Sequence, residues 1–321
     1  MMAGNKLMKH FSIRLAHRIR IGGLLCIVIC ASPAQTRTKS DQELPDSSSR
    51  VFDPAKDPSL ATIEAELRHE LELKPDSASL LFRLGQVLLR ENKPKESLDI
   101  YTRAARFQKP NAEQLRFVAM DYVLLKLYND AIHWLQVAHS MDSDDVNVMY
   151  DLGRCFYTQS RFHEAEEMYV KVLKIEPGSI KAEENLGLTL DKEVQPDRAE
   201  VALRAAVTWA ERQQTDEWPF LNLGTFLLEH ARAGEAVPFL EKAVSTAPTN
   251  AVCHEKLGRA LMQIENVQAG LSELESAARI DIKNPRIHFE LGRAYRHAGQ
   301  ADKAASEFAL SKSLYGEHSE D

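Results

Sequence analysis

The chain contains 321 residues, of which 44% are hydrophobic and 27% charged, and its formal net charge is −7. These values exclude a collagen-like, low-complexity or multi-spanning membrane protein. A net acidic chain also lacks the basic surface that a dedicated nucleic-acid-binding protein needs against the phosphate backbone, so we expect no nucleic-acid partner.

The first 34 residues have the pattern of a secretory signal peptide. They carry five basic and no acidic residues, an apolar run from Ile21 to Ala31, and then small residues at Ser32 and Ala34. The apolar run has eleven residues, whereas a membrane-spanning helix needs about 20. The pattern predicts cleavage after Ala34 and an exported protein, periplasmic or extracellular. A mitochondrial transit peptide and an uncleaved N-terminal anchor are the alternatives.

Residues 35–57 are rich in Ser, Asp, Thr and Pro and contain few large apolar side chains. Such a segment cannot bury enough apolar surface to offset its ordering entropy, so we expect a disordered linker. Loss of the export segment changes the net charge from −7 to −12, because five basic and no acidic residues leave with it.

Residues 58–75 have an apolar stripe with helical spacing, formed by Leu60, Ile63, Leu67 and Leu71. The spacing predicts one amphipathic helix. We expect it to cover the open face of the helices that follow, as a cap does at the end of a repeat array.

From residue 78 onward the sequence repeats with a period of 34. A Leu-Gly dipeptide or a near variant recurs at spacings of 34, 34, 34, 37, 34 and 34 residues. A small residue follows twelve positions after the second residue of each dipeptide, and a large apolar residue follows sixteen positions after it. The dipeptides are Leu84-Gly85, Val118-Ala119, Leu152-Gly153, Leu186-Gly187, Leu223-Gly224, Leu257-Gly258 and Leu291-Gly292.

Each repeat is predicted to be a pair of helices. Apolar residues recur at three- and four-residue offsets on both sides of a short polar turn, which is the spacing of one helix face. A glycine inside a helix costs about 1 kcal/mol relative to alanine. Its recurrence in one column therefore needs a packing reason, and close approach of the two helices supplies it.

The third repeat combines Leu152-Gly153, the small Ala165, the aromatic Tyr169 and a terminal Pro177. This pattern resembles the tetratricopeptide repeat family, over about residues 78–318. The resemblance implies an all-α fold, a right-handed superhelical solenoid of seven helix-hairpin repeats with an N-terminal half-repeat cap. The expected repeats are residues 78–111, 112–145, 146–179, 180–216, 217–250, 251–284 and 285–318. Three extra residues within 209–216 should lengthen the second helix of the fourth repeat.

Two pairs of residues invite a chemical interpretation. Cys155 and Cys253 lie three repeats apart, beyond the reach of a disulfide, so we expect free, packed thiols. His254 and His288 occupy the column in which other repeats have Leu81 or Phe220. We interpret them as packing residues, because a metal site would need further ligands at a suitable spacing.

The sequence contains no phosphate-binding glycine loop, no Gly-x-Ser-x-Gly elbow, no paired-Cys metal site and no His-Glu-x-x-His. We therefore predict that the protein is not an enzyme and that it needs no cofactor or metal.

In the tetratricopeptide repeat family, the first helix of each repeat lines a concave groove, through residues three before, one after and four after its glycine. Aromatic residues, Met and Arg are the side chains enriched in binding hot spots. The predicted partner-binding residues are Phe82, Arg116, Met120, Tyr150, Arg154, Tyr157, Trp218, Arg259, Arg286, Phe289, Arg293 and Arg296.

Four of these residues, Arg259, Arg286, Arg293 and Arg296, form a basic cluster in the last two repeats. Arginine suits bidentate binding of a carboxylate, so we expect an acidic protein or peptide partner. The alternative is a solvated face on which the arginines pair with Glu255 and Glu290. The Lys/Asn pattern of the family's chaperone-type clamp is absent.

The resulting hypothesis is a non-catalytic, exported scaffold that binds a peptide or protein segment in its groove. The competing hypothesis is an accessory subunit of a cell-envelope assembly or polysaccharide-export complex. We expect a monomer without a transmembrane span. End-to-end dimerisation through the last helix, residues 301–315, is the alternative, because no cap follows that helix in the predicted repeats.

Overall fold

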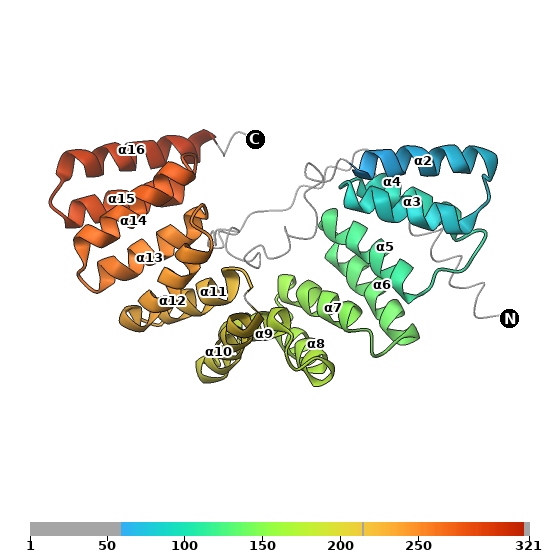
Figure 1. Ribbon diagram of the computed structural model, residues 1–321, viewed down its shortest axis with the longest axis horizontal. Coiled ribbons are helices and arrows are strands. Elements are labelled where there is room, and N and C mark those ends of the chain that lie inside the picture. The colour runs from blue at the N-terminus through green and yellow to red at the C-terminus, as the bar shows by residue number, and fades with distance from the viewer. Residues whose placement is uncertain (1–58, 214, 318–321) are drawn as a thin grey trace, which may run out of the picture. The chain divides into compact units, whose positions relative to one another are not determined.

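The computed structural model describes residues 59–213 and 215–317, which form fifteen helices and no strand (Figure 1). This confirms the predicted all-α fold. The export segment (residues 1–34) and the linker (35–57) lie outside the described residues. The chain starts with α2 (Ser59–Leu73). The first helices of the hairpins are α3 (Ala78–Arg90), α5 (Ala112–Leu124), α7 (Val146–Thr158), α9 (Ile180–Lys192), α11 (Trp218–Glu229), α13 (Ala251–Gln263) and α15 (Pro285–His297). The second helices are α4 (Pro94–Ala104), α6 (Tyr128–Met141), α8 (Phe162–Ile175), α10 (Pro196–Gln213), α12 (Ala233–Thr246), α14 (Val267–Ile280) and α16 (Ala301–Glu317).

The chain divides into two compact units, residues 1–171 and 172–321, with the boundary inside α8. Within each unit, helices adjacent in sequence pack against each other. The first helices of successive hairpins also touch: α3 with α5 and α5 with α7 in the first unit, and α9 with α11, α11 with α13 and α13 with α15 in the second. Each unit therefore has a face built from first helices alone.

The recurrent glycines lie where the two helices of a hairpin come closest. A Cβ atom at Gly258 would be 2.7 Å from Cγ of Leu274 and 3.0 Å from the carbonyl oxygen of Gly270. Real Cβ atoms do not tolerate such contacts, so the close approach predicted from the sequence is confirmed. The other close pairs are Gly85 with Tyr101, Gly153 with Tyr169, Gly187 with Leu203, Gly224 with Leu240, and Gly292 with Phe308.

Each hairpin turn places one residue in the left-handed backbone region. Only the last of these, Gly299 with φ of 73°, is a glycine. The others are Asn92, Lys126, Ser160, Val194, Ala231 and Glu265. Valine is the least suited of these residue types, because its branched Cβ clashes with the backbone at positive φ. Val194 has φ of 60° and is 84% exposed, so little packing compensates for the strain.

The predicted lengthening of the fourth repeat is confirmed. The second helix of this repeat, α10, has 18 residues, whereas α6, α8, α12 and α14 each have 14. Near its end, the Arg212 guanidinium lies 4.9 Å from the centre of the Trp209 ring. The same ring packs 3.5 Å from the Cβ position of Gly178 in the turn before α9. The extra residues thus extend the helix alongside its own hairpin.

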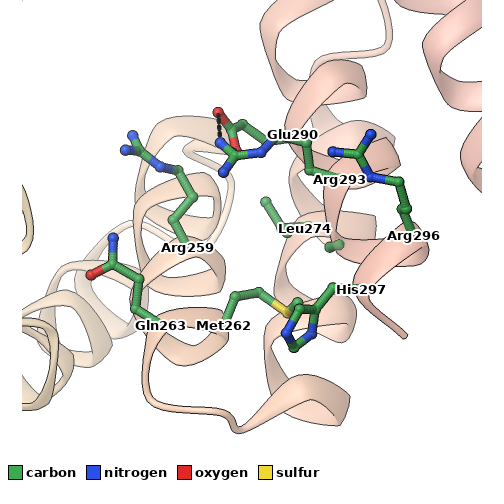
Figure 2. A pocket seen from close by; sticks show the side chains of 9 residues that line it. Arg259, Met262, Gln263, Leu274, Glu290, Arg293, Arg296 and His297 are labelled. Carbon is green, nitrogen blue, oxygen red and sulfur yellow. Dashed lines mark hydrogen bonds and ion pairs between the residues drawn. The ribbon is translucent and has the colours of Figure 1, made fainter. Parts of the chain in front are cut away.

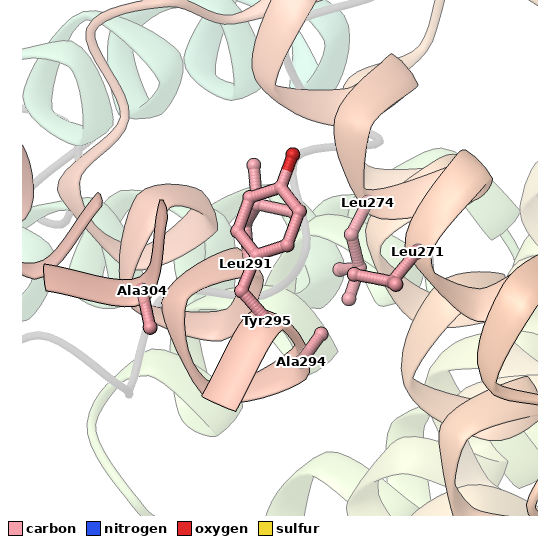
Figure 3. Close-up of a cluster of buried hydrophobic side chains, with 6 residues drawn as sticks. All are labelled: Leu271, Leu274, Leu291, Ala294, Tyr295 and Ala304. Atoms are coloured by element: carbon pink, nitrogen blue, oxygen red, sulfur yellow. The ribbon is translucent and has the colours of Figure 1, made fainter. Parts of the chain in front are cut away.

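The core of each unit consists of side chains from the seams between helices. In the last two hairpins the buried cluster includes Leu271 and Leu274 of α14, Leu291 and Tyr295 of α15, and Ala304 of α16 (Figure 3). Burial of this size contributes about 25 cal/mol per Å² of apolar surface. Within residues 59–213 and 215–317, no helix combines the length and apolarity required to cross a bilayer.

Candidate functional site

A pocket of about 340 Å³ opens between α13 and α15 (Figure 2). Figure 2 shows Arg259 on one side, Arg293 and Arg296 on the other, and the apolar side chain of Leu274 between them. Its lining residues are Arg259, Met262, Gln263, Leu274, Glu290, Arg293, Ala294, Arg296 and His297. Basic groups therefore surround an apolar patch made by Met262, Leu274 and Ala294.

The repeat itself brings these arginines together. Arg259 and Arg293 each follow the recurrent glycine of their repeat, and α13 contacts α15 directly. Arg296 lies one helical turn after Arg293, so both project from the same side of α15. Three of the four arginines that the sequence analysis grouped as a basic cluster line one pocket.

The fourth arginine, Arg286, lies outside the pocket and pairs with Glu255 at 3.1 Å. Arg259 also approaches Glu255, at 3.4 Å. Arg293 pairs with Glu290 at 3.2 Å. The two glutamates named in the alternative interpretation are therefore both engaged by arginines. Glu255 is almost fully buried, so two cations compensate the one carboxylate there.

Arg296 differs from the other three arginines. Its guanidinium lies 5.5 Å from the centre of the Phe308 ring. Among the described residues, no carboxylate lies within ion-pairing distance of it. Because four arginines face two glutamates, this surface keeps excess positive charge. Burial also lowers the pKa of the neighbouring Lys256.

In the first unit, the expectation that Phe82 and Tyr157 are exposed anchors is wrong. Both are buried, with 5% and 6% of their surface exposed. Phe82 packs against Tyr101 at a ring-centre distance of 6.0 Å, and Tyr157 packs edge-on against Phe162 at 5.4 Å. These rings fill hairpin seams and present little area to a partner.

Arg116 has a structural partner. Its Nε donates to Oδ2 of Asp151 at 2.5 Å, and Asp151 is buried on α7. The pair joins the first helices of two successive hairpins. The remaining predicted groove residues of this unit, Met120, Tyr150 and Arg154, are half-buried.

In the second unit, Phe289 is 46% exposed and packs against Phe308, with ring centres 5.6 Å apart. It lies one helical turn before Arg293 on α15. Trp218, at the start of α11, is half-buried. Exposed aromatic and basic side chains thus meet on α15, beside the pocket.

Sequence reasoning overlooked a buried acid in the first unit. Asp121 is fully buried, and burial raises its pKa to about 8. The hydroxyl of Ser97 lies 2.6 Å from Oδ2 of Asp121 and 2.9 Å from the carbonyl oxygen of Gly85. One hydroxyl proton cannot serve two acceptors, so a protonated Asp121 completes this chain of hydrogen bonds. The signal was an acidic residue in a column otherwise occupied by small or apolar side chains.

The two remaining cysteines are free and buried, as expected. Burial raises the pKa of the thiols of Cys155 and Cys253 to about 12. Thiols rather than thiolates are therefore present at neutral pH, and both side chains act as small apolar packing groups.

His254 and His288 do more than replace a packing residue. The Nδ1 atom of His254 lies 2.6 Å from Oε2 of Glu273, and the Nδ1 atom of His288 lies 2.7 Å from Oε2 of Glu307. The sequence analysis missed both glutamates. Their signal was available, because each follows its histidine by 19 residues.

Comparison with known proteins agrees with the hairpin geometry. Models of the tetratricopeptide repeat match residues 59–113, 146–179 and 255–313. The chain is a tetratricopeptide repeat protein. Members of this family bind protein partners and are in general non-enzymatic scaffolds, so this tetratricopeptide repeat protein is a protein-interaction scaffold.

A curated relative from Bos taurus, "BBSome complex member BBS4", is 22% identical over 260 residues, which are 81% of this chain and 48% of the relative. The chain thus spans about half of the length of that relative. A solved structure of the APC/C hetero-tetramer Cut9-Hcn1 is similar at a TM-score of 0.59 and 14% identity, covering 79% of this chain and 50% of the other. A repeat protein from Parabacteroides merdae is similar at 0.58 and 17% identity, covering 73% and 92%. These structural similarities establish the fold.

Proposed function

We infer that this protein is an exported, non-catalytic scaffold that binds an acidic segment of a partner protein in the pocket between α13 and α15. One observation carries the proposal. Arg259, Arg293 and Arg296 converge on a pocket whose lining also includes apolar side chains. An acidic side chain would pair with the guanidinium groups while a neighbouring apolar side chain covers Met262 and Leu274.

The competition with internal carboxylates sets the expected mode of binding. Arg293 already holds Glu290, whereas Arg296 is 5.5 Å from an aromatic ring and has no carboxylate partner among the described residues. A ligand carboxylate therefore binds Arg296 first and shares Arg293 with Glu290. The helices that carry these residues are packed on both sides, so little ordering cost falls on the scaffold.

The test uses two fluorescent peptide libraries that differ at one fixed position, Glu in one and Gln in the other. Fluorescence anisotropy with the wild-type protein should show tighter binding of the Glu library. Arg293→Glu with Arg296→Glu should remove that preference. Arg106→Glu with Arg279→Glu makes the same charge change at exposed positions away from the pocket and should retain it. Equal binding of both libraries to the wild-type protein would contradict the proposal.

Export is supported by the composition of residues 1–34, with its basic start, its eleven-residue apolar run and its small residues before the predicted cleavage position. N-terminal sequencing of the protein purified from its native source tests this part. A start at Gln35 supports export with cleavage, and a mature protein that begins at Met1 contradicts it.

A second candidate is a subunit of a larger assembly, including a cell-envelope or polysaccharide-export complex. It is favoured by the relative that is named as a member of a complex. Size-exclusion chromatography of a gentle native extract separates the candidates. Elution in a high-mass, membrane-associated fraction favours the subunit, and elution near 36 kDa favours the free adaptor.

A further inference from the structure

The two histidines of the last hairpins share one unusual hydrogen-bond pattern. Nδ1 of His254 faces the Glu273 carboxylate at 2.6 Å, and Nε2 faces the carbonyl oxygen of Pro248 at 3.0 Å. Nδ1 of His288 faces the Glu307 carboxylate at 2.7 Å, and Nε2 faces the carbonyl oxygen of Ile282 at 2.9 Å. Both rings are therefore held between two acceptors.

A carboxylate and a backbone carbonyl can only accept hydrogen bonds. A neutral imidazole donates from one ring nitrogen and an imidazolium donates from both. Satisfying all four contacts thus requires both rings to carry two protons. The rings are largely shielded from water, with 11% and 5% of the side chains exposed, so an unmade hydrogen bond is not replaced by solvent.

The chain's own repeats show that this arrangement replaces an apolar pair. The column of His254 and His288 holds Leu81, Leu115, Met149 and Phe220 in four other repeats. Nineteen residues later, where these two repeats have Glu273 and Glu307, the same four repeats have Ile100, Trp134, Met168 and Phe239. Both members of the pair change together. The fourth repeat, with Glu183 and Ala202, follows neither pattern.

Other charged groups near His288 are engaged elsewhere. On α14, Glu275 accepts a hydrogen bond from the Tyr295 hydroxyl at 2.8 Å. On α16, Lys303 lies 5.0 Å from the centre of the Tyr295 ring. On α15 itself, Arg286 pairs with Glu255 and Glu290 pairs with Arg293. Glu307 is the carboxylate that faces His288.

The surroundings of His254 are similar. On α12, Lys242 lies 5.9 Å from the centre of the Phe220 ring. The Glu217 carboxylate before α11 accepts from Asn250 at 3.1 Å. On α13 itself, Lys256 approaches Glu229 at 3.8 Å. Glu273 of α14 is the carboxylate that contacts the ring.

We propose that His254 and His288 are imidazolium clamps, which fasten the turn before the first helix of each hairpin to the second helix, and that loss of one proton opens each clamp. The clamped first helices, α13 and α15, are those that line the arginine pocket. A neutral ring keeps one of its two hydrogen bonds and leaves one buried acceptor unsatisfied. The stability of these two hairpins therefore falls as the pH rises and the rings lose their second proton. This inference is independent of any partner.

The test replaces each clamp with the apolar pair of the first repeat, Leu81 and Ile100. The full chain carrying His254→Leu, Glu273→Ile, His288→Leu and Glu307→Ile is compared with the wild-type protein by thermal unfolding between pH 5 and 9. The wild-type midpoint should fall relative to that of the variant as the pH rises. Parallel curves, or a gap that moves in the opposite direction, would overturn the proposal.

A spectroscopic measurement keeps the proposal falsifiable if the fourfold variant fails to fold. Ring ¹⁵N chemical shifts of the ¹⁵N-histidine-labelled wild-type protein distinguish an imidazolium, with two equivalent protonated nitrogens, from a neutral ring, with two different ones. His254 and His288 should give the imidazolium pattern at pH 6.5, and Glu307→Gln should remove it from His288 alone. A neutral pattern for both rings in the wild-type protein would exclude the clamp.

Discussion

Residues 59–171 and 172–317 use the same hairpin but fill its equivalent positions with different chemistry. In the first unit, the column of Leu81, Leu115 and Met149 is apolar and buried. In the second, the same column ends in two histidines hydrogen-bonded to carboxylates. The hairpin accepts either solution, because it requires only that both members of the pair satisfy each other.

The faces built from first helices differ in a similar way. In the first unit, Arg116 neutralises the buried Asp151, and the ring of Phe82 is buried in a seam. In the second unit, Arg293 and Phe289 remain exposed beside a pocket. Equivalent positions thus support the structure in one unit and form a candidate binding surface in the other.

The largest expected effect tests the structural role of Arg116. Arg116→Met leaves the Asp151 carboxylate buried without its partner, which should destabilise the protein by ~3–5 kcal/mol. Urea unfolding monitored by circular dichroism measures the change. Arg116→Met with Asp151→Leu removes both charges and should recover most of the loss. A double variant as unstable as the single one would show that the ion pair is not the cause.

The buried acid should give the first unit its own dependence on pH. The pKa of Asp121 is raised from 3.8 to about 8, so between these values the folded protein holds a proton that the unfolded chain has released. Stability then falls as the pH rises, by at most ~1.4 kcal/mol per pH unit. Asp121→Asn should flatten this part of the curve in chemical denaturation from pH 4 to 8. A wild-type slope that this substitution leaves unchanged would contradict the assignment.

A smaller effect should follow at the glycine column of the second unit. Gly258→Ala forces a methyl group against Leu274 and the Gly270 carbonyl oxygen, and overpacking of this kind costs ~1–3 kcal/mol. Gly234→Ala is the matched control, because nothing lies within 4 Å of its Cβ position in α12. The control should stabilise the protein by up to ~1 kcal/mol. Equal shifts of the urea midpoint in both variants would show that helix contact does not select glycine at position 258.

The smallest expected effect concerns the hairpin turns. Val194→Gly relieves the left-handed strain at an exposed position, and the glycine's greater freedom in the unfolded chain offsets part of the gain. A net stabilisation of ~0.5–1 kcal/mol should appear as a higher thermal midpoint. Gly299→Val, the reverse change in the last turn, should lower the midpoint. A loss of stability in Val194→Gly would mean that the valine side chain makes a contact worth more than the strain.

The hairpins could be predicted from the sequence because they depend on local periodicity and on a glycine column with an evident packing reason. The basic cluster could also be predicted, since Arg259, Arg293 and Arg296 follow directly from the repeat register. The burial of Phe82 and Tyr157 could not, because it depends on how far Tyr101 and Phe162 reach across the seam. Register specifies the side of a helix, whereas exposure depends on the size and direction of neighbouring side chains.

The sequence by itself determined the element order, the hairpin, the positions of close approach and the lengthened α10, because each of these depends on spacing along one chain. Only the tertiary structure decided which polar groups meet: Arg116 with Asp151, Ser97 with Asp121, and His288 with Glu307. Such pairs lie 19 to 35 residues apart. Their formation depends on distances of less than 3 Å between groups that the repeat period aligns but does not bring into contact.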